Sequence, residues 1–189
     1  MATAERARPS RREQILAVAA QLFARRGFHG VSIADLGAAV GISGPALYRH
    51  FPGKEALLTE LLVGISERLL AGGQAIAAAG RDPQQVLAEL IRFQADFARR
   101  DPELIVVQDR DLASLPAAER HRVRQLQRTY VEIWVNTLRR CHPGLPADAA
   151  RIAAHGAFGL LNSTPHAGTG PEVAELLGRM ARSALTHLS

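Results

Sequence analysis

The chain has 189 residues, and its 23 lysine and arginine side chains against 18 aspartates and glutamates give a formal net charge of +5. Its composition, 47% hydrophobic and 22% charged, is typical of folded domains and excludes a wholly disordered chain. The single cysteine, Cys141, excludes an intramolecular disulfide framework and a metal site built from several cysteines. The mild positive excess is only a hint of a polyanionic partner.

Neither the start of the chain nor its hydropathy indicates export or membrane insertion. Residues 1–9 lack the apolar segment of a secretory signal. The sequence also contains no run of roughly 18 consecutive apolar residues, which a membrane-spanning helix needs. We therefore expect a cytoplasmic protein that does not enter a membrane.

Serine caps and glycine stops predict three helices at the start of the chain. Ser10 opens a capping box with the glutamate three residues later, and the helix it begins continues to Gly27. Ser32 opens a second box, and Gly41 ends that short helix. Ser43 caps a third short helix over residues 44–51, which ends at a Pro-Gly pair.

The rest of the chain continues as helices separated by proline- and glycine-containing turns. We find no convincing strand and no internal repeat. The sequence thus predicts an all-α fold of about nine helices, and the remaining six are expected at about 54–79, 83–100, 102–113, 117–141, 147–163 and 172–188.

Residues 32–51 have the layout of a helix-turn-helix motif. Two short helices flank a tight turn, in which Gly41 supplies the left-handed backbone conformation. The second helix of such a motif lies in the major groove of DNA, with its first residues towards the base edges. Its outward positions in this chain are Gly44, Pro45, Tyr48, Arg49 and His50.

The string from Val40 to Leu58, VGISGPALYRHFPGKEALL, together with the segment from Ile15 to Gly30, resembles the N-terminal domain of the TetR/AcrR family of bacterial transcriptional regulators. The resemblance covers about residues 10–60. It implies an all-α homodimer, in which residues 1–53 form a helix-turn-helix DNA-binding domain with a short basic arm. Residues 54–189 would form a helical domain for effector binding and dimerisation. Most members of the family are repressors that a small molecule releases from DNA.

The resemblance also implies DNA contacts at particular positions. Ser32 would cap the second helix and touch a phosphate, and Lys54 would stand near the DNA backbone at the start of the fourth helix. The recognition helix and its cap would contribute Ser43, Gly44, Pro45, Tyr48 and His50.

One departure from the family pattern affects base recognition. Many members have a polar residue directly after the position of Ser43, whereas this chain has Gly44-Pro45. The sequence therefore favours Arg49 and the basic arm, with Arg8, Arg11 and Arg12, for discrimination between operators. The alternatives are a Tyr48 half-buried in the core, an Arg49 that is merely solvated, a His50 that only caps the helix end, and a solvated, disordered arm.

The second domain is expected to hold an effector pocket. Tyr130 and Trp134 lie one helical turn apart, and each combines an apolar body with a polar tip. The alternative is that these aromatic residues are ordinary core and the polar ones surface. The predicted pocket residues are Phe93, Phe97, Asp109, Tyr130, Trp134, Phe158, Asn162 and His166.

The last two predicted helices, at about 147–163 and 172–188, are expected to form the homodimer. The first is rich in alanine and glycine, which permits close approach, and the second carries an apolar stripe. The alternative is that both faces pack within one subunit. A dimer would read a near-palindromic operator whose half-sites lie roughly 34–36 Å apart.

The sequence carries no motif for catalysis, a metal or a cofactor: it has no HExxH, no phosphate-binding loop and no dinucleotide-binding fingerprint. We therefore expect a regulator that is not an enzyme, a repressor released from a palindromic operator by a small apolar or amphipathic effector. Two alternatives stay open, an architectural DNA-binding protein without an effector and an enzyme with an unrecognised helical site. A void-free C-terminal domain would favour the architectural protein.

Overall fold

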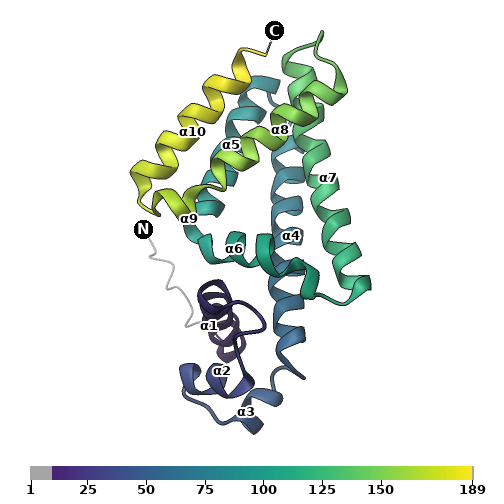
Figure 1. Ribbon diagram of the computed structural model, residues 1–189. Coiled ribbons are helices and arrows are strands. Elements are labelled where there is room, and N and C mark those ends of the chain that lie inside the picture. Colours follow the sequence, from purple (N-terminus) through teal and green to yellow (C-terminus); the bar gives the residue numbers. More distant parts are fainter. Residues whose placement is uncertain (1–9, 189) are drawn as a thin grey trace, which may run out of the picture.

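The computed structural model describes residues 10–188, and this part of the chain consists of helices joined by short turns (Figure 1). The predicted all-α fold is confirmed. Nine of the described α-helices correspond to the predicted ones, and a four-residue helix, α9, lies between the last two. The elements are α1 (Arg11–Arg26), α2 (Ile33–Val40), α3 (Gly44–Tyr48), α4 (Lys54–Ala78), α5 (Pro83–Arg100), α6 (Pro102–Asp111), the 3₁₀ helix η1 (Leu112–Ser114), α7 (Ala117–Cys141), α8 (Ala147–Leu161), α9 (Thr164–Ala167) and α10 (Pro171–Thr186).

Both predicted capping boxes are present in the structure. At α1, the Ser10 N–H donates to Glu13 Oε2 over 2.7 Å, and Ser10 Oγ accepts from the Glu13 N–H over 3.2 Å. At α2, Ser32 and Asp35 make the corresponding bonds of 2.8 Å and 3.1 Å. Gly41 then ends α2 in the left-handed region with φ of 73°. Each of these helix caps involves bonds between residues only three or four positions apart, which is why the sequence alone predicts it.

The third helix is shorter than predicted. We expected a helix over residues 44–51, but α3 ends at Tyr48, and Arg49 and His50 lie in the turn that follows. The N–H groups of His50 and Phe51 both donate to the carbonyl of Leu47, at 2.9 Å and 3.0 Å, and close this turn. Pro52 then disfavours helical backbone at the residue before it, which prevents α3 from continuing.

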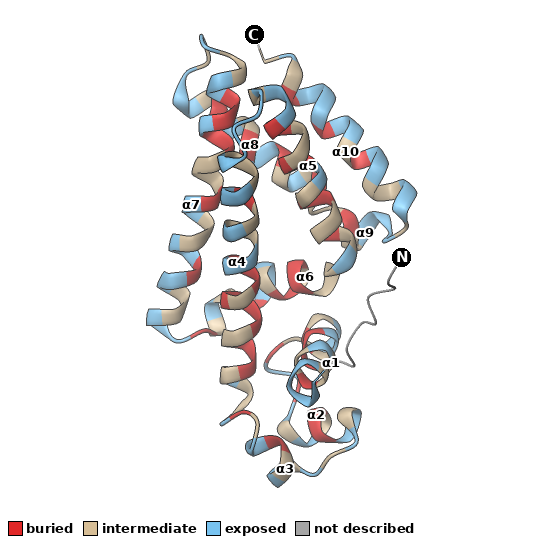
Figure 2. Ribbon diagram, turned by 180° about the vertical axis from the view of Figure 1, so that it is seen from behind, coloured by how far each residue is buried: buried red, intermediate tan, exposed pale blue. Residues whose placement is uncertain are grey.

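The buried side chains form two hydrophobic cores that share α4 (Figures 1 and 2). The first core joins α1, α2 and α3 to the first half of α4, and side chains of α6 and α7 close it. The second joins α5, α7, α8 and α10. The boundary predicted between residues 53 and 54 therefore lies inside a shared core, because Leu57, Leu58 and Leu62 of α4 are buried against the first three helices.

Among the described helices, α4 is the one that is long and apolar enough to cross a membrane by length and composition. Its most apolar window of 18 residues has a mean hydropathy of 1.2, and 33% of that window is buried. In this fold α4 packs against α1, α5, α6 and α7. Contact with four helices requires apolar side chains on several faces, and this packing accounts for its hydropathy.

Two glycines allow a matched test of the packing. A Cβ on Gly37 of α2 would lie 2.8 Å from the carbonyl oxygen of Ile42, on the far side of the helix-turn-helix turn. A Cβ on Gly64 of α4 would have no neighbour within 4 Å. We expect Gly37→Ala to lower the free energy of unfolding by about 1–3 kcal/mol, because backbone must move. Gly64→Ala should raise it by about 1 kcal/mol. Urea unfolding of both variants measures these changes, and a stabilised Gly37→Ala protein would contradict the packing of α2 on the turn.

Candidate nucleic-acid interface and ligand cavity

The helix-turn-helix presents its polar residues at one end of the molecule, where α2, α3 and the start of α4 meet (Figure 1). Leu47 is fully buried and fixes α3 on the first core, whereas Tyr48 is 54% exposed. Pro45 and Arg49 are exposed as well. Ser43 Oγ accepts from the N–H of Ala46 over 3.4 Å and so caps α3, as predicted. The first turn of α3 and the turn after it are therefore free to meet a partner.

An open hollow of about 560 Å³ lies between the N-terminal ends of α2 and α4. Its walls include Ser32, Tyr48, Gly53 and Lys54. Backbone N–H groups at helix N-termini carry partial positive charge and favour a bound anion. The two helix N-termini and Lys54 bring positive charge to the hollow, and the carboxylates of Asp35 and Glu55, which also line it, bring negative charge.

Lys54, predicted to stand near phosphate, also holds the protein's own backbone. Its Nζ donates to the carbonyls of Phe28 and Val31, over 3.1 Å and 3.2 Å, and lies 4.5 Å from the centre of the Phe28 ring. These contacts tie the loop between α1 and α2 to the start of α4. The half-buried ammonium thus contributes positive potential to the hollow from a fixed position.

Arg12, predicted as a candidate for operator discrimination, is exposed but already has partners within the protein. Its guanidinium forms a two-pronged ion pair with Glu60 and donates to the carbonyl of His50 over 2.7 Å. It also lies 4.1 Å from the centre of the Phe51 ring. Arg12 therefore joins α1 to α4 and to the turn after α3. Arg11 is exposed, and Arg8 lies outside the described residues.

Ser32 is first of all a helix cap. Its Oγ accepts from the Asp35 N–H and also donates to Asp35 Oδ2 over 2.6 Å. These bonds, with the nearby Arg26 guanidinium 3.2 Å from Asp35 Oδ1, hold the pKa of the Asp35 carboxyl down at about 2. Asp35 is consequently ionised, and its charge supports the N-terminus of α2.

A separate cavity of about 190 Å³, partly open to solvent, lies in the second half of the molecule between α4, α5, α6, α7 and α8. Four of the predicted pocket residues line it: Phe97, Tyr130, Phe158 and Asn162. They come from three helices and the C-cap of α8, so the tertiary structure brings them together across a large distance in sequence.

The other four predicted pocket residues do not line this cavity. Phe93 faces Gly72 of α4, where no side chain competes for the space. Trp134 is fully buried with its ring centre 4.8 Å from that of Phe158. Asp109 and His166 are exposed; partial burial raises the pKa of Asp109, and His166 opposes that rise.

Polar residues beyond the eight predicted pocket residues complete the cavity. Gln94 is 1% exposed, donates to Asn162 Oδ1 over 2.9 Å and accepts from the Tyr130 hydroxyl over 3.1 Å. The sequence signal for this site is a glutamine on the apolar face of the 83–100 segment, because a buried glutamine needs hydrogen-bond partners. The other polar lining residues are Ser66, Gln108, Gln127 and His155.

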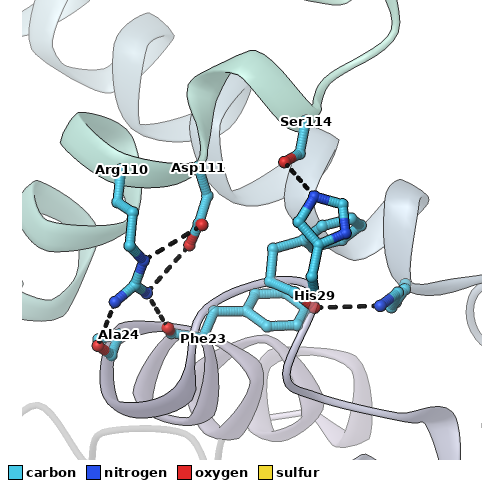
Figure 3. Close-up of polar contacts among 8 residues, drawn as sticks. Phe23, Ala24, His29, Arg110, Asp111 and Ser114 are labelled. Carbon is cyan, nitrogen blue, oxygen red and sulfur yellow. Dashed lines mark hydrogen bonds and ion pairs between the residues drawn. The ribbon is translucent and has the colours of Figure 1, made fainter.

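Helix α6 connects the cavity region to the end of α1 (Figure 3). Arg110 donates to the carbonyls of Phe23 and Ala24 in the last turn of α1, the latter over 3.2 Å. Asp111, which is 5% exposed, holds the same guanidinium at 3.1 Å and 3.2 Å. Ser114 of η1 makes a further bond of 3.1 Å to His29 Nε2. A cation on the C-terminal carbonyls of α1 is favourable because these groups carry partial negative charge.

Two family models match this architecture. The model described as "Bacterial regulatory proteins, tetR family" matches residues 15–61, and "Tetracyclin repressor-like, C-terminal domain" matches residues 80–166. The chain belongs to the TetR family. The first match runs into α4, in agreement with the shared core, and the second contains most of the cavity.

Curated relatives of this TetR-family chain include two DNA-associated proteins. The HTH-type transcriptional repressor KstR2 of Rhodococcus jostii is 30% identical over 68% of this chain and 63% of its own length. The nucleoid occlusion factor SlmA of Escherichia coli O1:K1 / APEC is 33% identical over 55% of this chain and 53% of its own. The chain thus aligns with less than two thirds of either relative.

Solved structures share the complete fold. A TetR-family transcriptional regulator from Bordetella parapertussis superposes with a TM-score of 0.86 at 23% identity, and covers 93% of this chain and 94% of its own. AibR, solved with isovaleryl coenzyme A and operator DNA, gives a TM-score of 0.78 at 18% identity, and covers 94% and 99%. At these sequence identities the structural similarity shows the fold alone.

The exposed arginine beside the hollow gives a test of the DNA-facing surface. We expect Arg49→Gln to weaken DNA binding and to reduce the slope of log K against log salt concentration by about one per bound subunit. The matched control is Arg139→Gln, at an exposed site in the last turn of α7. Fluorescence anisotropy across a salt series measures both slopes. Equal slopes for the two variants would remove Arg49 from the interface.

Proposed function

We propose that the protein is a ligand-responsive repressor that acts in the cytoplasm, is not an enzyme, and binds a palindromic DNA operator as a homodimer. A small effector in the cavity between α4 and α8 would release it from DNA. In the proposed complex, the DNA contacts are made by the exposed residues around α3 and by the hollow between α2 and α4.

One observation carries this proposal: α6 lines the cavity and also contacts α1 of the DNA-binding domain. Ile105 and Gln108 line the cavity, while Arg110 and Asp111, within the next turn of the same helix, hold the end of α1. Helix α1 in turn packs on α2 and α4. A ligand that displaces α6 therefore acts on the position of the helix-turn-helix.

The arrangement supports antagonism between ligand and DNA. If the ligand favours one position of α6 and the operator another, each lowers the affinity of the other by the same factor. Coupling free energies of this kind are about 1–3 kcal/mol, or about 5- to 150-fold in affinity. The contact between Arg110 and α1 is the element expected to carry this energy.

Exposed apolar side chains on α8 and α10 support the proposed dimer. Ile152 is 73% exposed, Leu176 49% and Met180 47%. The adjacent Gly156 and Gly159 of α8 are also exposed, and a Cβ on either would meet nothing within 4 Å. Such a surface allows two helices to approach closely, and a stable dimer buries about 1,200–2,000 Å² in total.

The relatives support this function over the architectural alternative. KstR2 is named as a repressor, and AibR was solved with both an acyl-coenzyme A and an operator. SlmA, a nucleoid occlusion factor, favours a DNA-binding role without an effector. The cavity supports the ligand-responsive function, because a DNA-binding protein without an effector needs no internal space lined by polar groups.

Selection of bound fragments from genomic DNA by the purified protein tests the proposal directly. We expect an enriched near-palindrome whose half-sites are about one helical turn apart. Genes beside the selected sites would then supply candidate effectors, whose ability to release the protein can be measured. Binding without sequence preference would instead indicate the architectural role.

The dimer surface yields a prediction of its own. Ile152→Glu places a charge on the most exposed apolar side chain of α8, and we expect it to produce a monomer with weaker operator binding. Ala118→Glu, at an exposed site near the start of α7, is the control. Sedimentation velocity gives the mass of each protein. A dimeric Ile152→Glu protein with undiminished operator affinity would contradict the assignment.

The α6–α1 contact can be tested without any ligand. Arg110→Gln removes the charged donor from the Phe23 and Ala24 carbonyls, which should cost about 1.5–3 kcal/mol of local stability. We expect amide hydrogen exchange in α1 and α2 to accelerate at least about tenfold. Arg151→Gln, which breaks the Arg151–Glu132 ion pair between α8 and α7, should leave that exchange unchanged. Identical exchange in the two variants would show that Arg110 does not hold the domain.

A further inference from the structure

The cavity walls carry hydrogen-bonding groups but no formal charge. Among the described residues that line it, the polar ones are three glutamines, an asparagine, a tyrosine, a serine and a histidine, without any aspartate, glutamate, lysine or arginine. A carboxylate or phosphate held against these walls would lose part of its hydration without gaining a cation from the lining, which is unfavourable. The walls therefore select against an anionic group inside the cavity.

A buried relay of hydrogen bonds determines what the cavity offers a ligand. The Tyr130 hydroxyl donates to Gln94 Oε1, and Gln94 Nε2 donates to Asn162 Oδ1. Burial raises the pKa of Tyr130, so it remains a neutral phenol that can donate. Because the Asn162 oxygen already accepts a bond, its amino group is left as the free donor, and within residues 10–188 this Nδ2 has no hydrogen-bond partner.

The size and the apolar walls limit the remainder of the ligand. Leu69, Phe97, Ile105, Val131 and Phe158 supply the hydrocarbon surface. The volume, about 190 Å³, is below the roughly 300–1,000 Å³ of most ligand pockets, and a cavity of about 150 Å³ holds benzene. A ligand group of about ten non-hydrogen atoms is therefore the largest that fits.

We infer that the cavity binds an uncharged carbonyl group attached to a compact hydrocarbon, whose oxygen accepts a hydrogen bond from Asn162 Nδ2. This inference rests on the proposed function and specifies its effector. The group can belong to a free neutral molecule, such as an amide, ester or ketone. It can also be the acyl end of a thioester whose charged carrier lies outside the cavity. The shared chemistry is the neutral acyl carbonyl.

The chain provides its own probe of the cavity. Trp134 is the only tryptophan, and its ring lies 4.8 Å from that of Phe158, which lines the cavity. We propose to titrate the full chain with cyclohexanecarboxamide and with cyclohexanecarboxylate near neutral pH and to follow Trp134 fluorescence. The two probes differ in charge and little in shape.

We expect the amide to bind at least about tenfold more tightly than the carboxylate. Equal affinities, or tighter binding of the carboxylate, would overturn the inference, and so would no binding of the amide at millimolar concentration. The coenzyme A thioester of the same acid separates the two sources. If the thioester binds more tightly than the amide, the ligand is assigned as a thioester. If it binds more weakly, the ligand is assigned as a free neutral molecule. Both results support recognition of the acyl carbonyl.

Substitution of Asn162 tests the predicted donor. Asn162→Asp keeps the oxygen that accepts from Gln94 Nε2 and removes the amino group, so amide binding should fall at least about tenfold. Asn136→Asp makes the same chemical change at an exposed position of α7 and should leave binding unchanged. If Asn162→Asp does not fold, Asn162→Ala removes the donor without adding charge, and the same loss is expected. A folded Asn162 variant with unchanged amide affinity would overturn the inference.

The experiment distinguishes the inference from the proposed function because fluorescence does not involve DNA. Amide binding that does not displace the selected operator would overturn the ligand-responsive function and leave the cavity chemistry intact. Operator release by the carboxylate as readily as by the amide would overturn the cavity chemistry and leave the function intact.

Discussion

The structure depends on α4, a helix of 25 residues that belongs to both hydrophobic cores. Its first half completes the three-helix domain, and its second half lies along α5 and α7. Two contacts from sites distant in sequence fix its lower end: Arg12 pairs with Glu60, and Lys54 holds the carbonyls of Phe28 and Val31. The helix-turn-helix is thus attached to one continuous helix that also lines the cavity.

Helix α1 contacts α6 as well as α4. Arg110 and Asp111 join α6 to the end of α1, and the same helix supplies Ile105 and Gln108 to the cavity. The energetic reason for the contact between Arg110 and α1 is local, since a cation is favourable beside the partly negative carbonyls at the C-terminus of a helix. The proposed consequence is communication between the two ends of the molecule through one short helix.

Charged and polar residues acquire their roles from partners far away in the chain. Arg12 lies in the predicted basic arm, yet it pairs with Glu60, which is 48 residues away in the chain. In the sequence, Gln94 is an isolated polar residue on an apolar stripe. In the structure it donates a hydrogen bond to Asn162, which is 68 residues away. Phe93 and Trp134 have the size of pocket residues, but Phe93 packs over Gly72 and the Trp134 ring packs against that of Phe158.

The sequence by itself determined the features that depend on nearby residues. Helix caps at Ser10, Ser32 and Ser43, the left-handed Gly41 and the family motif over residues 40–58 all act within a few turns, so their spacing could be read directly. The tertiary structure decided which side chains meet in the cavity, which arginines are already paired, and where the two cores divide. These depend on the packing of helices separated by tens of residues, and the sequence pattern of each helix gives its buried face but not its neighbours.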